Sequence, residues 1–136
     1  MRTSIQLILG AALRLFIPWL LVVIAATWAG YPGVACITPM AWLLALPVGV
    51  RIEARSTSPG AGQRLREAAL AGALLGLLQG FLFLLIMPRL GPLQADERAS
   101  AGMIALALLI IGIPIAAGLS TLTAWLAQRR TSQTAA

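Results

Sequence analysis

The chain has 136 residues, of which 60% are hydrophobic and only 10% are charged, and its formal net charge is +6. A typical soluble domain carries roughly 25% charged residues, and a domain this small has too much surface to hide so many apolar side chains from water. The composition therefore excludes an ordinary soluble domain and predicts an integral membrane protein.

The first half of the chain contains two apolar runs. A helix needs about 20 residues to cross a hydrocarbon core of about 30 Å. Residues 5–29 form a run of this length, which ends in a turn-forming sequence at residues 30–33. Residues 34–50 form a second and shorter run that contains Pro39 and Pro47. We predict a transmembrane helix for each run.

The second half repeats this arrangement after a polar interruption. Residues 51–64 are charged at first and then rich in Ser, Gly and Pro, which is typical of a flexible linker. A third apolar run covers residues 65–87 and a fourth covers residues 101–127, before a polar tail at residues 128–136. The sequence therefore predicts an all-α fold, a bundle of four transmembrane helices that forms a single integral membrane domain over residues 1–136.

The arginines predict the orientation of this bundle. All ten basic residues are arginine, because the sequence contains no lysine. They are concentrated at the N-terminus, around the connection between the second and third runs, and in the tail, as Arg2, then Arg51, Arg55, Arg64 and Arg66, then Arg129 and Arg130. Because positive residues favour the inner side of a membrane, we expect both termini to be cytoplasmic in a plasma (inner) membrane protein.

The first run has an alternative interpretation as a cleaved signal peptide. Arg2 and Arg14 would then belong to its charged region and residues 15–26 to its apolar core, with cleavage near Ala29. That interpretation would leave three spans. The apolar residues before Arg14 and the poor cleavage site at residues 27–29 favour four spans.

Small residues recur at intervals of four in the third run. They are Ala68, Gly72, Gly76 and Gly80, and this spacing places them on one face of a helix. Helices in lipid associate through close van der Waals contact, which small side chains permit. The stripe predicts a helix-packing seam. Its partner is either a helix of the same bundle or a helix of another chain.

Arg14 lies well inside the first run, and an ionisable residue at such a position is by default a candidate functional site. Counting along the helices places Ser120 and Thr121 at a similar depth and places Gln79 near Thr38. These five residues form a candidate intramembrane polar site. Arg14 would bind an anion or a lipid phosphate there, or extend its long side chain to the inner headgroups. A third interpretation is that the membrane begins near Arg14.

The residues that are absent limit the chemistry. The chain has no histidine and one cysteine, so it lacks the commonest general base and metal ligand and has no cysteine pair for a disulfide. We therefore expect no catalytic residues, no cofactor and no metal site.

Three functional hypotheses remain, and one of them is a holin-like pore former. The leading one is a non-catalytic membrane protein that acts through helix–helix association, as a homo-oligomer or a small accessory subunit of a larger membrane complex. The alternative is a small channel or anion/lipid transporter that uses Arg14. The expected partners are the lipid bilayer, a second copy or a larger membrane complex. No nucleic-acid partner is expected, because the arginines flank the apolar runs as topology signals do.

Overall fold

The computed structural model describes residues 2–30, 42–86 and 95–135. These residues form helices and contain no strand, which confirms the predicted all-α class. The helices are α1 (Arg2–Trp28), α3 (Ala45–Arg55), α4 (Ala61–Ile86) and α5 (Ala95–Thr134).

Three of the described helices are long and apolar enough to cross a membrane, over Ser4–Trp28, Ala61–Leu85 and Leu106–Thr134. The predicted second span, 34–50, is not among them. Its residues 34–41 lie outside the described part of the chain, and the rest belongs to a 3₁₀ turn and to α3. With 11 residues, α3 is roughly 17 Å long, about half of a hydrocarbon core.

Helix boundaries differ from the predicted runs because hydropathy marks the apolar stretch and not the end of a helix. The segment predicted as a linker, 51–64, is largely helical, since α3 continues to Arg55 and α4 begins at Ala61. The predicted tail is helical through Thr134. Alanine, glutamine and arginine in these segments are good helix formers. Gln128 also donates hydrogen bonds to Glu53 (2.9 Å) and to the carbonyl oxygen of Ala61 (3.2 Å).

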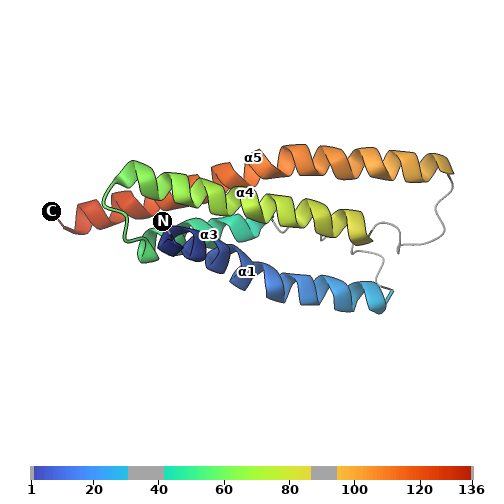
Figure 1. The fold of residues 1–136 in the computed structure, drawn as a ribbon, viewed down its shortest axis with the longest axis horizontal. Coiled ribbons are helices and arrows are strands. Elements are labelled where there is room, and N and C mark those ends of the chain that lie inside the picture. Colours follow the sequence, from blue (N-terminus) through green and yellow to red (C-terminus); the bar gives the residue numbers. More distant parts are fainter. Residues whose placement is uncertain (1, 31–41, 87–94, 136) are drawn as a thin grey trace.

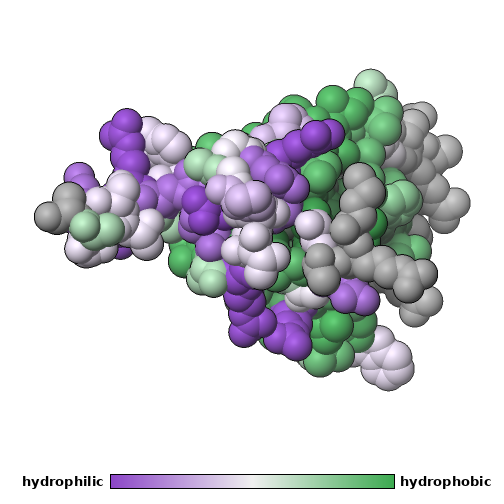
Figure 2. All heavy atoms as spheres, turned by 60° about the vertical axis from the view of Figure 1, so that its left-hand side comes forward, coloured by the Kyte–Doolittle hydropathy of each residue, from purple (hydrophilic) through white to green (hydrophobic). Residues whose placement is uncertain are grey.

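The described helices lie roughly side by side, and α1 and α4 run opposite to α3 and α5 (Figure 1). The N-terminus, the connection at residues 56–60 and the C-terminus therefore meet at one end of the bundle, called here the polar end. Polar side chains gather there, whereas the surface behind it is mostly hydrophobic (Figure 2).

The central helix is α4. Half of its spanning segment is buried, against 22% for α1 and 17% for α5. On its α5 side a Cβ at Gly72 would collide with the carbonyl oxygen of Ala116, and one at Gly76 would lie 2.8 Å from that of Gly112. The two helices can therefore approach this closely only where α4 has no side chain.

A buried cluster fixes α3 near the polar end. Val48 and Ile52 of α3 are fully buried, and the cluster takes its other members from α1, α4 and α5, namely Ala11, Ala68, Ala71 and Ala124. Gly49 of α3 also lies against the backbone of Ser120 in α5. Because one face of α3 is held in this way, the orientation of its remaining faces is determined as well.

We predict that Gly72→Ala lowers the free energy of unfolding by about 1–3 kcal/mol, since overpacking a close helix contact costs that amount. Gly118 is the matched control, because a Cβ built there meets nothing within 4 Å. Gly118→Ala should leave stability unchanged or raise it by up to about 1 kcal/mol through helix propensity. Unfolding in mixed micelles measures both variants. Equal effects would contradict the close contact between α4 and α5.

The meeting of both termini with residues 56–60 predicts a labelling pattern for single-cysteine variants. In a Cys36→Ser background, Thr57→Cys and Gln133→Cys should react with a membrane-impermeant maleimide on the same side of the membrane. Ala29→Cys, at the other end of α1, should react on the opposite side. Labelling of Thr57→Cys and Gln133→Cys from different sides would contradict this arrangement of the helices in the bilayer.

Candidate functional site

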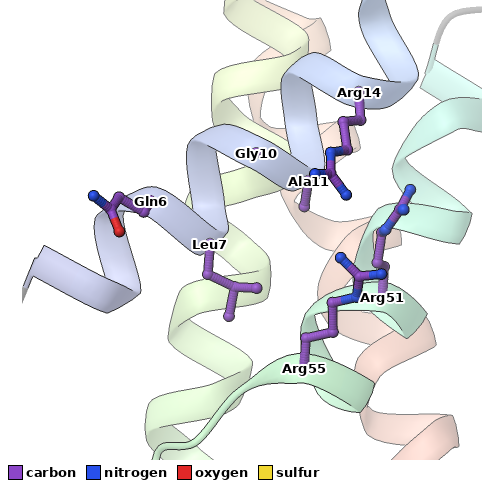
Figure 3. A pocket seen from close by; sticks show the side chains of 7 residues that line it. All are labelled: Gln6, Leu7, Gly10, Ala11, Arg14, Arg51 and Arg55. Carbon is purple, nitrogen blue, oxygen red and sulfur yellow. The ribbon is translucent and has the colours of Figure 1, made fainter.

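A cavity of about 120 Å³ lies between α1 and α3, on the side of the bundle near the polar end. Three arginines from two helices converge on it (Figure 3). Its full lining consists of Gln6, Leu7, Gly10, Ala11, Arg14, Arg51 and Arg55. We call this space the arginine cavity.

Helix geometry explains why these side chains meet. Arg51 and Arg55 are four residues apart, so they share one face of α3 next to the face that Val48 and Ile52 bury. Arg14 is likewise four residues after Gly10 on α1. In Figure 3 the guanidinium groups of Arg14, Arg51 and Arg55 point into the space between the two helices.

The carboxylates near the polar end are engaged elsewhere. Glu53 forms an ion pair with Arg64 at 3.4 Å, and it is the single ion pair among the described residues. Glu67 accepts hydrogen bonds from the hydroxyls of Ser56 (2.7 Å) and Ser58 (2.6 Å). Within the described part of the chain, the three guanidinium groups of the arginine cavity therefore have no carboxylate within 4.0 Å.

Three positive charges in one small cavity repel one another. At 4 Å two like charges cost about 1 kcal/mol in water and about 4 kcal/mol at an effective dielectric constant of 20. An anion relieves this repulsion. Guanidinium groups bind carboxylates and phosphates through paired N–H donors, which adds directional hydrogen bonds to the charge attraction. The arrangement is therefore suited to an oxyanion.

A second cavity, of about 150 Å³, adjoins the first, and Leu7 and Arg55 line both. Its other lining residues carry hydroxyl groups or a carboxylate, and they are Ser4, Ser56, Thr57, Ser58 and Glu67. We call it the hydroxyl cavity. Only 5% of Glu67 is exposed, and its hydrogen bonds from Ser56 and Ser58 hold residues 56–60 against α4. The Ser4 side chain of α1 also hydrogen-bonds to Glu67.

The residues proposed for an intramembrane polar site occupy different places. Arg14 lines the arginine cavity and is exposed, whereas Ser120 is fully buried in α5. The hydroxyl of Thr121 donates to the carbonyl oxygen of Ala117 in its own helix (2.7 Å), and Gln79 is buried in α4. Thr38 lies outside the described residues. The number of residues along each helix gives the depth of a side chain in the membrane, but it does not determine which face of the bundle that side chain occupies.

The small-residue stripe of α4 faces α5 of the same chain. Gly72 and Gly76 contact its backbone, Gly80 contacts Leu109, and Ala68 is fully buried in the cluster around α3. This face is occupied within the chain. Association with a second copy or a larger complex stays a prediction, and it would have to use another face.

Sequence reasoning missed Arg51, Arg55 and Glu67 as parts of a site. The two arginines were assigned to a linker, although their spacing of four would have placed them on one face had α3 been extended. Glu67 lies inside the third apolar run, which made it as unusual there as Arg14 is in the first run.

Comparison of this chain with protein-family models, with curated proteins and with solved structures finds no match.

Glu67→Ala removes the acceptor of both serine hydroxyls, and we predict that residues 56–60 become accessible to protease. Hydrogen bonds to a charged group contribute about 1.5–3 kcal/mol each, so trypsin cleavage after Arg55 should become at least about ten-fold faster. Limited digestion in micelles measures this rate. The exposed neighbour Gln63 provides the control as Gln63→Ala. Equal rates for the two variants would contradict the role given to Glu67.

Proposed function

We propose that the chain is a non-catalytic, multi-pass protein of the plasma (inner) membrane that binds an oxyanion, above all a phosphate group, in the arginine cavity. A single observation carries this proposal. Arg14, Arg51 and Arg55 direct three guanidinium groups into one cavity, and among the described residues no carboxylate neutralises them.

The position of the cavity supports a ligand from the cytoplasmic side. It lies near the polar end, where the arginines of α3, of α4 and of the C-terminal part of α5 also lie. Positively charged segments favour the cytoplasmic side of a membrane. The phosphates of the inner leaflet, and phosphate-bearing solutes, are therefore the anions that the cavity meets first.

Binding of this kind is also the first step of the alternative function, a small channel or transporter for an anion. Pro18 follows Arg14 by one turn of α1 and cannot donate a hydrogen bond to its carbonyl oxygen, which weakens the helix at this position. If Arg14 does not bind an anion, the alternative function, in which Arg14 takes part in anion transport, is therefore excluded as well.

The proposal predicts that dodecyl phosphate, added at a low fraction to maltoside micelles, raises the melting temperature of the protein. A ligand at 100-fold excess over its Kd stabilises by about 2.7 kcal/mol. The double variant Arg14→Gln and Arg51→Gln should lose most of this shift. The control variant, Arg66→Gln with Arg130→Gln, removes the same charge outside the arginine cavity and should retain it.

An equal rise in melting temperature in both double variants would contradict the proposal, because stabilisation by dodecyl phosphate would then depend on the net charge of the protein and not on the arginine cavity. Dodecyl maltoside added at the same fraction controls for the alkyl chain. No shift in the wild-type protein at any fraction of dodecyl phosphate would exclude a phosphate site in the arginine cavity.

A further inference from the structure

Three features follow one another along α1 from the polar end towards the middle of the bundle. Ser4 lines the hydroxyl cavity, Arg14 lines the arginine cavity, and the exposed apolar residues Ile17 and Leu21 come next. A phospholipid has the same order of parts, since its headgroup substituent, its phosphate and its acyl chains follow one another from water to the membrane interior.

The size of the arginine cavity limits what enters it. Its volume of about 120 Å³ corresponds to roughly four water molecules at about 30 Å³ each. This space is large enough for one phosphate-sized group, and its three guanidinium groups disfavour an acyl chain, which cannot hydrogen-bond to them. Any apolar part of the ligand must therefore lie outside the cavity, on the surface of the helices.

The exposed apolar surface of α1 starts at Ile5 and continues past Arg14. Ile17 is 50% exposed and Leu21 is 61% exposed, and they follow Arg14 by three and seven residues, so all three share a face of α1. A chain attached to a phosphate at Arg14 would lie along Ile17 and Leu21 in the direction of the membrane interior. An amphiphile therefore fits this region better than a free anion does.

The hydroxyl cavity indicates the other end of the ligand. Thr57 contributes an exposed hydroxyl, and the Ser58 hydroxyl, which donates to Glu67, keeps its acceptor lone pairs. The Ser56 oxygen already accepts a hydrogen bond from the backbone N–H of Ser58 (3.3 Å). A headgroup with hydroxyl groups can both donate and accept here. An ammonium headgroup would meet opposing charges here, because Arg55 and Glu67 both line this cavity, whereas a neutral hydroxyl-bearing headgroup is matched by the hydroxyls alone.

We propose that the ligand is an anionic phospholipid with a hydroxyl-bearing headgroup, of the glycerol type. Its phosphate occupies the arginine cavity, its headgroup hydroxyls occupy the hydroxyl cavity, and one acyl chain lies along α1. This inference rests on the function proposed above, because it assigns the source of the phosphate bound by Arg14, Arg51 and Arg55.

The test compares phospholipids with identical acyl chains in titrations of the protein in maltoside micelles, with lipid binding read by native mass spectrometry. Phosphatidylglycerol and phosphatidylethanol carry the same charge, but only the first has headgroup hydroxyls. We expect phosphatidylglycerol to bind about 5-fold more tightly than phosphatidylethanol, as one added hydrogen bond predicts. Phosphatidylcholine should bind about 10-fold more weakly than phosphatidylethanol or worse.

Two variants assign the preference to the cavities. Arg14→Gln should weaken phosphatidylglycerol binding about 10-fold or more, as expected for the loss of a charge-assisted hydrogen bond, whereas Arg66→Gln should not. Thr57→Val should reduce the preference for phosphatidylglycerol over phosphatidylethanol. Thr57 is exposed on the connection at residues 56–60, so this variant keeps the packing of the helices.

Three outcomes would overturn the inference, and they separate it from the function proposed above. Equal affinity for phosphatidylglycerol and phosphatidylethanol would exclude the hydroxyl-bearing headgroup. Thermal stabilisation of the protein by millimolar inorganic phosphate, together with equal affinity for all the phospholipids, would exclude a lipid ligand and leave the anion site intact. Binding that is equal in the wild-type protein and in Arg14→Gln for every probe would exclude both.

Discussion

The contact between the backbones of α4 and α5 is the constraint on which the other positions depend. No hydrophobic effect drives helices together in lipid, so the helices must approach closely to gain enough van der Waals contact. Gly72 and Gly76 allow this approach, because a Cβ at either position would meet carbonyl oxygens of α5. Gly49 does the same for α3 against α5. The close packing of the bundle core thus depends on glycine at these three positions, where any side chain would keep the helices apart.

The short helix α3 connects this packing to the arginine cavity. Val48 and Ile52 are buried among the other helices, which leaves Arg51 and Arg55 directed towards α1. Glu67 holds the connection at residues 56–60 by its hydrogen bonds from Ser56 and Ser58. Glu53 accepts a hydrogen bond from Gln128 of α5 and forms an ion pair with Arg64 of α4. Because these carboxylates are occupied, the charge of the cavity is left for a ligand.

Composition was sufficient to predict the all-α class of fold, and the spacing of four predicted that Ala68, Gly72, Gly76 and Gly80 share one face of a helix. Hydropathy could not give the ends of α3, α4 and α5, because those ends are set by helix propensity and by contacts of Gln128 across the bundle. Arg14 stood out because it interrupts an apolar run. Arg51 and Arg55 did not, because their role depends on the direction in which α3 faces, and tertiary packing alone determines that direction.

We propose that the arginine cavity holds the phosphate of a ligand. Solid-state NMR of the protein in phosphatidylglycerol bilayers, with ¹³C at the arginine Cζ atoms, measures their dipolar coupling to ³¹P directly. We expect a phosphorus atom about 4–5 Å from Cζ, the separation that charge-assisted hydrogen bonds impose, and its loss in the double variant Arg14→Gln with Arg51→Gln. An equal ¹³C–³¹P dipolar coupling in the wild-type protein and in this double variant would contradict a phosphate in the arginine cavity.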